Sequence, residues 1–407
     1  MGALSPLVDL TPRDGQPPLV SIVVVTHGTG PVVVRMLASI GRHTSYAQHP
    51  FEVVVVDNPA ANGRTSALLH ETTTGVRVVP APHNLGFGGG CNLGVEMSRG
   101  EFVCLANPDL VVTEGWLEPL LDALRDPQVA IAAPVLLHED GTVQEAGQVV
   151  FRDGGTDPIG GPRLFPGDRS VLFDRDVDYA SAACWVLARS TYVGLGGFDQ
   201  EYHPAYFEDA DLAMRVEAAA GKVTRLVTAR PVIHLHGEGT AADDGSRARL
   251  AESSRETFEE RWAGELAQRP ERPTDEAGAL DARDRACPAR WLVLVASSDL
   301  DSRGEIRDMV DAAAALAARR PRDRVTLAVD VLADEERHRR TACRLGLELV
   351  VGDLQRQYGL RAERASGIAV SGDAALVAVG GAPGVERAGA QPVLWSERHR
   401  SWPEHGQ

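Results

Sequence analysis

The stretch Asn84–Asp109, which reads NLGFGGGCNLGVEMSRGEFVCLANPD, decides how the rest of this chain is interpreted. Its first part holds five glycines in nine positions: Gly86, Gly88, Gly89, Gly90 and Gly94. Because glycine has no Cβ, a loop of this composition lets the backbone come within contact distance of a ligand. The run 102–105 (FVCL) is bounded by glycine and proline, and it predicts a fully buried strand of a parallel sheet.

That apolar run ends on Asn107, Pro108 and Asp109. Open α/β sheets bind their ligands at the carboxyl ends of the strands. A carboxylate at that point, beside a loop built for close approach, suggests a hard metal ion that holds a phosphorylated ligand. The competing interpretations are a glycine turn without a ligand and an Asp that only closes a turn after proline.

Two further apolar runs flank this stretch on its N-terminal side. Residues 19–26 (LVSIVVVT) and 51–56 (FEVVVV) predict buried strands, and between them Val33, Leu37 and Ile40 fall on one face of a helix. Continuous apolar strands with a helix between them indicate a parallel, doubly wound α/β arrangement. We also expect helices at 66–72, 114–124, 207–220 and 248–260, and strands at 76–79, 129–134, 179–188, 223–226 and 231–234.

The length of 407 residues suggests two domains. Residues 1–18 are rich in Pro and Gly and predict a loose lead-in, and residues 19–265 would form the first domain. Residues 266–289 have the Pro, Arg and Glu content of a linker. Residues 290–407 then predict a smaller α/β unit with strands at 291–296, 325–331, 347–351 and 375–379 and helices around Met309–Leu316 and at 335–345. Within the first domain, residues 138–176 have the composition of a long loop with a hairpin.

Charge and cysteine content narrow the class of protein. The chain has 41 basic and 57 acidic residues, a net charge of -16, which makes a nucleic acid an unfavourable partner. The five cysteines are odd in number and form no CxxC pair, so we expect neither a disulfide framework nor a zinc site. There is no secretory leader pattern and no apolar run near the roughly 18 residues that a membrane helix needs. We therefore expect a cytoplasmic protein. Peripheral attachment to the inner face of the cell membrane is compatible with these observations.

A second candidate site lies in the run 207–212 (FEDADL), at the predicted start of a helix. Acidic residues in a first turn complement the helix dipole, and that is the simpler explanation for them. Glu208, Asp209 and Asp211 nevertheless place three carboxylates in four positions, which is more than capping needs. Further on, a predicted strand delivers His234 and His236.

These motifs occur in an ordered set: VSIVVVTHG, VVVVDN, NLGFGGGCNLG, LANPD, GGFDQEYHPAYFEDADLAMRV and VIHLHGEG. The set resembles the family 2 glycosyltransferases, and within them the bacterial rhamnosyltransferase-like group, over residues 19–240. The resemblance implies a GT-A fold with a mostly parallel twisted sheet, a nucleoside-diphosphate sugar donor, a divalent metal, and inversion at the anomeric carbon. The C-terminal unit lies outside it and is somewhat similar to half of a Rossmann-like nucleotide-binding domain, which favours an accessory or oligomerisation module.

Residue by residue, the resemblance first implies a donor site. Asp57 matches the acidic residue that usually reads the nucleobase, since a carboxylate can accept from a pyrimidine ring N–H; capping of a βα turn is the alternative. The turn after it, DNPAANGRTSALL, departs from the family, whose members more often carry Ser and Asp after the Asn. The full set of implied donor-binding residues is Thr26, His27, Asp57, Asn84, Gly86, Phe87, Asn92 and Asn107.

The resemblance also implies metal ligands. Asn107-Pro108-Asp109 takes the place of the family's DxD motif, so Asp109 is the expected principal ligand of Mn²⁺ or Mg²⁺. His234 would complete the coordination, with His236 as the alternative. A single carboxylate predicts weak metal binding and dependence on added metal.

Catalytic roles follow from the same match. Asp209 aligns with the base that takes the proton from the acceptor hydroxyl. Glu208 would orient the acceptor, and Asp211 would cap the helix or hold a nearby Arg. Trp185 sits where the family lines the acceptor side, although an aromatic in an apolar strand is as well explained by the core.

The leading hypothesis is therefore an inverting, metal-dependent hexosyltransferase. It would move a rhamnose-like or other hexose from a UDP, dTDP or GDP sugar to a cell-envelope glycan or its lipid-linked precursor. The alternatives are a sugar nucleotidyltransferase, for which HGTGPVVVR is a poor triphosphate loop, and a non-catalytic module that binds nucleotide sugars.

Overall fold

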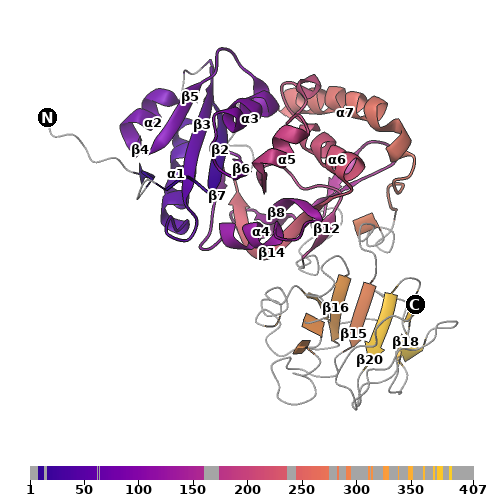
Figure 1. Ribbon diagram of the computed structural model, residues 1–407. Coiled ribbons are helices and arrows are strands. Elements are labelled where there is room, and N and C mark those ends of the chain that lie inside the picture. Colours follow the sequence, from indigo (N-terminus) through magenta and orange to yellow (C-terminus); the bar gives the residue numbers. More distant parts are fainter. Residues whose placement is uncertain are drawn as a thin grey trace. The chain divides into compact units, whose positions relative to one another are not determined.

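The computed structural model describes most of the N-terminal two thirds of the chain and short segments beyond it. The described residues are 8–12, 16–61, 63, 65–159, 174–235, 244–274, 282–283, 290–294, 310–311, 313–314, 324–329, 338, 347–351, 361–362, 370–371, 374–378 and 385–386. Contacts divide the chain into two compact units, one of Met1–Gly167 and Val177–Pro273, the other of Asp168–Asp176 and Thr274–Gln407 (Figure 1).

A ten-stranded sheet is the frame of the first unit, and eight of its strands form one continuous path. In spatial order they are β12 (Arg175–Val177), β14 (Val223–His234), β8 (Val129–Leu137), β13 (Cys184–Ala188), β6 (Phe102–Ala106), β2 (Val20–His27), β3 (Phe51–Asn58) and β5 (Val76–Pro80). Off this path, β7 (Leu110–Val111) pairs with β14, and β9 (Val143–Glu145) pairs with β8.

The sheet consists of two parallel parts joined by one antiparallel strand. Strands β6, β2, β3 and β5 are mutually parallel, and so are β8 and β14. Strand β13 runs antiparallel to both of its neighbours, β6 and β8. The expected mostly parallel α/β sheet is confirmed, while the direction of β13 was not predicted, because an apolar run reads the same in either direction.

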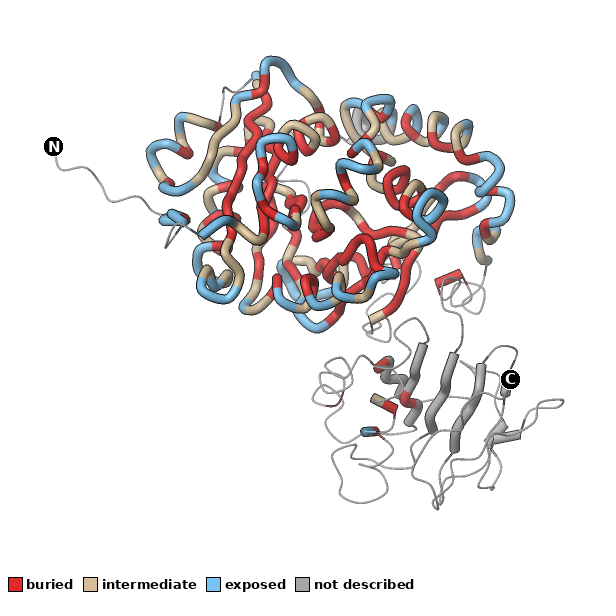
Figure 2. The backbone as a smooth tube through the Cα atoms, viewed as in Figure 1, coloured by how far each residue is buried: buried red, intermediate tan, exposed pale blue. Residues whose placement is uncertain are grey.

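Helices cover both faces of this sheet. One core contains residues of α1 (Gly30–His43), α2 (Ser66–Thr72) and α4 (Leu117–Ala123). The other contains residues of α3 (Gly86–Glu96), α5 (Arg189–Gly194), α6 (Glu208–Ala220) and α7 (Asp244–Leu266). Successive residues of β2 point alternately into the two cores, because side chains alternate between the faces of a strand. Figure 2 shows the result, with buried strands inside and exposure concentrated on helix surfaces and loops.

The glycine-dense segment is a helix rather than the expected loop. Gly90 and Gly94 lie inside α3 and face β2, where an added Cβ would come within 2.6 Å of Val25 and 2.3 Å of Val23. These glycines therefore let the helix pack closely on the sheet. Gly86, with φ +69, is the exception, because it passes against the carbonyl of Pro204 in a conformation that favours glycine.

The expected loose lead-in is ordered at Val8–Leu10. Strand β1 (Val8–Asp9) pairs in parallel with β4 (Thr73–Thr74), and the side chains of Val8 and Leu10 are buried in the core. Apolar residues at alternate positions explain this strand, which the Pro and Gly content of the lead-in obscured.

Several elements differ from prediction in extent. The predicted helix at 114–124 is the shorter α4, and the predicted strand at 179–188 is a bend followed by β13. The strands expected at 223–226 and 231–234 are one strand, β14, with an irregularity between Val227 and Val232 where Pro231 cannot donate to the ladder. The hairpin expected in the long loop is present as β10 (Gln148–Val150) and β11 (Thr156–Pro158).

The first part of the expected linker packs on the first unit. Arg269 is 4% exposed and pairs with Asp178 and Glu217, and Arg272 pairs with Asp153 and Asp157. The compact unit accordingly extends to Pro273. The rest of the expected linker lies outside the described residues, apart from residues 274 and 282–283.

The second unit contains a smaller, mostly parallel sheet. Its order is β17 (Glu348–Val351), β16 (Arg324–Val329), β15 (Arg290–Leu294), β20 (Ala374–Ala378) and β19 (Val370–Ser371), with β19 antiparallel at one edge. The strands β18 (Arg361–Ala362) and β21 (Val385–Glu386) form a separate pair. The four predicted strands are confirmed, while most of the two predicted helices lies outside the described residues. In the described part of the chain, no helix is long and apolar enough to cross a membrane.

Close packing of α3 on β2 predicts that a methyl group at Gly94 destabilises the fold. We expect Gly94→Ala to lower the free energy of unfolding by about 1–3 kcal/mol, because the new Cβ overpacks against Val23. Gly264→Ala in α7 is the matched control, since nothing lies within 4 Å of an added Cβ there. Urea titrations should show the control unchanged or more stable by about 0.5–1 kcal/mol. Equal stability of the two variants would contradict this packing argument.

Candidate active site

Asp109 and His234 meet at one edge of the large sheet. Asp109 follows β6, and the pairing of β7 with β14 sets Leu110 opposite His234. The Oδ1 atom of Asp109 lies 3.3 Å from Nε2 of His234, and both side chains are buried. The backbone closes the contact, since the N–H of Leu235 donates to the carbonyl of Asp109 at 3.0 Å. Two residues more than a hundred positions apart are thus brought together by strand pairing.

The imidazole of His234 is held by a side chain that the sequence did not indicate. Gln144 Oε1 lies 2.8 Å from Nδ1 of His234, and Gln144 Nε2 donates to the His234 carbonyl at 3.3 Å. Because Gln144 Nε2 donates to the carbonyl, it is Gln144 Oε1 that faces the ring, and it accepts a hydrogen bond from Nδ1–H of His234. The Nε2 lone pair then faces Asp109 and the amide of Asn107, 3.3 Å away. A histidine that ligates a metal is commonly oriented in this way.

This donor set fits a divalent ion that shares its coordination with a substrate. It offers one carboxylate and one imidazole nitrogen. Among the residues that the structure describes, no three His, Cys, Asp or Glu side chains are arranged to hold a metal by themselves. A metal held by Asp109 and His234 would therefore need oxygen ligands from a bound diphosphate, as is usual for Mg²⁺ sites. The alternative ligand, His236, lies outside the described residues.

The acidic run opens α6 from a strained turn. Tyr206 and Phe207 have φ values of +79 and +67, in the left-handed region that non-glycine residues rarely adopt. The turn places Glu208 and Asp209 in the first turn of the helix. Asp209 Oδ2 accepts from the N–H of Ala182 at 3.2 Å, and Oδ1 accepts from the N–H of Ala210 at 2.8 Å.

Burial changes the acidity of both carboxyl groups. It raises the pKa of Glu208 well above the ordinary range, with the charge of Asp209 adding to the effect. It also raises the pKa of Asp209, against the N–H groups of Ala182 and Ala210, which lower it. A carboxylate with a raised pKa is a better proton acceptor near neutral pH, as a general base must be.

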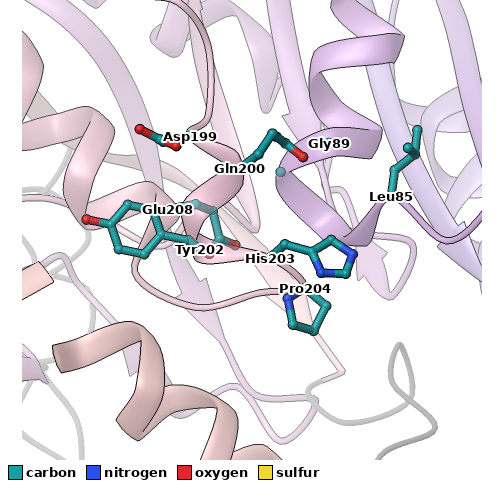
Figure 3. Close-up of a pocket in the computed structure, with 9 residues that line it drawn as sticks. Leu85, Gly89, Asp199, Gln200, Tyr202, His203, Pro204 and Glu208 are labelled. Carbon is teal, nitrogen blue, oxygen red and sulfur yellow. The ribbon is translucent and has the colours of Figure 1, made fainter. Parts of the chain in front are cut away.

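A small pocket lies beside Glu208 (Figure 3). Glu208 Oε2 is buried and has no hydrogen-bond partner within the described part of the chain. The pocket is lined by Leu85, Gly88, Gly89, Asp199, Gln200, Tyr202, His203, Pro204 and Glu208. The sequence did not single out the 199–204 segment, although it stands inside the quoted GGFDQEYHPAYFED motif.

A bend at Ser181–Ala183, just before β13, connects two acidic clusters: Asp109 with its partner His234, and Glu208 with Asp209 on α6. Consecutive backbone groups of this bend each bind a different part of the site: Ser181 N–H donates to Glu145 at 2.7 Å, Ala182 N–H donates to Asp209, and the Ala183 carbonyl accepts from Asn107 N–H at 2.8 Å. Asp209 is therefore bound by Ala182, and the neighbouring residue Ala183 binds Asn107 in the segment that carries Asp109.

Glu145 is the main site residue that sequence reasoning missed. It lies on β9, inside the stretch expected to be a long loop, and only its place in a short polar run beside Gln144 could have pointed to it. Burial raises its pKa to about 7, against hydrogen bonds from Ser181 and Gln148, and the charge of Asp209 raises it further.

Asp57 has the capping role that the sequence analysis set against nucleobase recognition. Its Oδ1 accepts from Thr26 Oγ1 at 3.1 Å and from Thr65 N–H at 3.2 Å, and its Oδ2 accepts from the N–H of Ser66 at 2.9 Å and from the Ser66 hydroxyl. The carboxylate is fully buried at the start of α2. Thr26 and His27 end β2, which is parallel to β3 and β6, so these residues lie at the same sheet edge as Asn107.

Other implied donor residues mostly support the backbone. Asn84 Oδ1 accepts from Gly86 N–H at 3.0 Å, and Phe87 packs against Phe198 with ring centroids 5.8 Å apart. The side chain of Asn58, which was not predicted, donates to the Gly86 carbonyl at 3.1 Å and accepts from Leu85 N–H at 3.0 Å. It ties the end of β3 to the start of α3.

Asn92, which we expected to line the donor, is hydrogen-bonded within the protein. Its Oδ1 accepts from the Tyr192 hydroxyl at 2.6 Å and from Phe198 N–H at 2.9 Å, and its Nδ2 donates to the Phe198 carbonyl at 2.7 Å. These hydrogen bonds join α3 to the turn after α5.

Trp185 lies in the core, which is one of the two roles expected for it. Its side chain is fully buried, its Nε1–H donates to the Ala180 carbonyl at 2.9 Å, and its ring packs on Phe198. The expectation that Asp211 holds a nearby Arg is confirmed, since its carboxylate pairs with Arg215 and Arg261.

The raised pKa of Glu145 predicts a pH dependence of stability. The folded state binds this proton more tightly than the unfolded chain, whose pKa is near 4.5. The stabilisation is therefore complete below about pH 4.5 and is lost as the pH rises through about 7, a change of roughly 3 kcal/mol. Denaturant titrations between about pH 5 and about pH 8 should show this loss in the wild type and not in Glu145→Gln. Identical pH slopes for the two proteins would rule it out.

Comparison with known proteins identifies the family of this chain. The model of the family described as Glycosyl transferase family 2 matches residues 21–191. The N-acetylglucosaminyl-diphospho-decaprenol L-rhamnosyltransferase of Mycobacterium tuberculosis is 30% identical over 259 residues, which cover 58% of this chain and 82% of that protein. The O-antigen biosynthesis protein RfbC of Myxococcus xanthus is 30% identical over 236 residues, 56% of this chain and 18% of that protein.

A crystal structure of GalNAc-T7 with UDP, GalNAc and Mn²⁺ aligns with 62% of this chain and 49% of that chain, at 14% identity and a TM-score of 0.48, a likeness too weak to carry an argument. The family match and the rhamnosyltransferase relative are stronger, and they agree with the sheet described above. The chain therefore belongs to glycosyl transferase family 2, in its rhamnosyltransferase-like group, and its large sheet is the α/β GT-A fold of that family.

Proposed function

We propose that this protein is an inverting, metal-dependent hexosyltransferase. It would transfer a rhamnose-like or other hexose from a UDP, dTDP or GDP sugar to a hydroxyl of a cell-envelope glycan or its lipid-linked precursor. The name of the mycobacterial relative, which describes a lipid-linked acceptor and a rhamnosyl group, supports this class of reaction. An enzyme with such an acceptor would work in the cytoplasm, at the inner face of the membrane.

The observation that carries the proposal is the meeting of the two acidic clusters at one sheet edge. Asp109 contacts His234, and Asp209 binds the same bend as the backbone of Asn107. A transferase of this kind needs a cation-binding pair for the leaving diphosphate and a base for the attacking hydroxyl, close together. The contacts supply both within one buried neighbourhood.

In the proposed mechanism Asp209 is the general base. Its carboxylate takes the proton from the acceptor hydroxyl as that oxygen attacks C1 of the sugar, on the face opposite the leaving diphosphate. Inversion needs one such base and no covalent intermediate. Glu208, with a buried oxygen beside the pocket, would accept a hydrogen bond from the acceptor and orient it.

Asp109 and His234 would hold a divalent ion, Mn²⁺ or Mg²⁺. When bound, the ion neutralises the diphosphate and stabilises the charge that it gains on leaving. Gln144 keeps the His234 ring in the orientation that this role requires. Asn107 lies against the same imidazole, where its amide can donate to a phosphate oxygen.

The remaining donor contacts are assigned to the ends of β2 and β3 and the start of α3. Thr26, His27, Asn84, Gly86 and Phe87 would line the nucleotide. Asp57 would meet the nucleobase only by giving up one of its present capping bonds. We further propose that a GT-A domain of about residues 19–265 carries the activity. The C-terminal α/β unit would then act as an accessory or oligomerisation module.

Replacement of the proposed base tests the mechanism directly. We expect Asp209→Asn to lower kcat for sugar transfer about 10³-fold or more, because the amide cannot take a proton. Binding of the donor should be nearly unchanged, as measured by calorimetry with the nucleotide sugar. Asp122→Asn, an exposed change on α4, is the control and should keep full activity. Turnover retained by Asp209→Asn would remove Asp209 from the role.

Metal dependence can be measured apart from activity. A thermal-shift screen of UDP, dTDP and GDP sugars should give stabilisation that requires Mn²⁺ or Mg²⁺, about 2.7 kcal/mol at a hundredfold excess over Kd. Asp109→Asn should abolish the metal-dependent part of this shift, because an amide oxygen is a weaker ligand for a hard cation. Excess chelator should stop transfer, and added metal should restore it. Full activity in chelator would refute the metal role.

A further inference from the structure

Glu145 is the centre of a hydrogen-bond chain that ends at the proposed base. Tyr179 donates its hydroxyl to Gln148 Oε1 at 2.7 Å, and Gln148 Nε2 donates to Glu145 Oε2 at 2.7 Å. The other oxygen of Glu145 accepts from Ser181 N–H at 2.7 Å. The next N–H along the chain, that of Ala182, donates to Asp209.

The two carboxylates therefore hold neighbouring N–H groups of one short bend. Residue 181 is half-buried and lies between the buried residues 180 and 182, so water does not readily replace Glu145 as the acceptor. Loss of the Glu145 contact would free the Ser181 peptide to rotate. Residue 181 joins this peptide to the next one, so its movement shifts the Ala182 N–H, which among the described residues is the only donor to Asp209 from outside α6.

We propose that Glu145 is a positioning residue for catalysis, which fixes the Ser181–Ala182 bend and thereby the carboxylate of Asp209. The proposal rests on the assignment of Asp209 as the base. Glu145 does not touch the reacting atoms in this arrangement, and it acts through the backbone.

A purely structural role explains Glu145 less well. A buried carboxyl group with a raised pKa makes the folded state less stable at neutral pH than an uncharged side chain of the same shape would. The group is thus unfavourable for folding under the conditions in which it is ionised. It lies beside the one bend that joins the two acidic clusters, where a fixed acceptor is useful to the reaction.

The charge of Glu145 provides a readout that packing alone would not change. The titratable groups that face this neighbourhood are Tyr179 before β13, Glu208 and Asp209 on α6, and His234 on β14. Asp209 ionises before Glu145, because its charge is among the causes that raise the pKa of Glu145 to about 7. The ionised Glu145 is a stronger acceptor for Ser181 N–H than the neutral group, so kcat of the wild type should rise as Glu145 ionises near pH 7.

The experiment compares Glu145→Ala, Glu145→Gln and the exposed control Glu139→Gln, which lies between β8 and β9 and pairs with Arg35 on the surface. For Glu145→Ala we expect kcat to fall about 10- to 100-fold with KM for the donor nearly unchanged, because only the position of the base is affected. Glu145→Gln keeps one acceptor for Ser181, so it should recover most of kcat while the rise near pH 7 is lost. The control should match the wild type in both respects.

Asp209→Asn separates this inference from the proposed function. If Asp209→Asn stays active, the assignment of the base is wrong and the positioning role is lost with it. If Asp209→Asn is inactive, a wild-type kcat in Glu145→Ala overturns the positioning role alone, and so does a fall in kcat that is matched by weaker donor binding. Should Glu145→Ala not fold, a Glu145→Gln rate profile identical to that of the wild type around pH 7 overturns it.

Discussion

The candidate site depends on the backbone of the bend at Ser181–Ala183. Its consecutive polar groups bind Glu145, Asp209 and Asn107, which come from β9, α6 and the end of β6. Backbone N–H and C=O groups that are buried must find partners, and here the partners are the site residues themselves. The same hydrogen bonds that satisfy the bend therefore link Asp209 to the segment that carries Asp109.

The antiparallel strand β13 explains why this bend lies where it does. Because β13 runs against β6 and β8, the chain that leads into it arrives at the edge where the parallel strands β6 and β14 end. A parallel β13 would bring its carboxyl end to that edge instead. The direction of one strand thus places the acidic helix α6 and the Asp109–His234 contact around a common point.

Burial raises the pKa values of the acidic residues at this site, and it lowers the stability of the folded protein. Glu145 and Glu208 are buried, and the charge of Asp209 adds to the desolvation that raises their pKa values. The strained backbone at Tyr206 and Phe207 adds a second local cost, since left-handed conformations are unfavourable for such residues. The dense apolar strands and the close seating of α3 on β2 supply the stability against which these costs are set.

The sequence by itself determined the α/β class, the order of the main strands and helices, and the motifs that carry Asp109, Asp209 and His234. Apolar runs of β-branched residues and the spacing of Val33, Leu37 and Ile40 are local signals, and local signals survive without coordinates. The tertiary structure alone decided that the glycines of α3 serve packing, that Asn92 ties α3 to the turn after α5, that Trp185 packs in the core, and that Gln144 and Glu145 lie beside the candidate site residues. Each of these depends on which strand lies beside which, and that pairing is long-range information that no short window of residues contains.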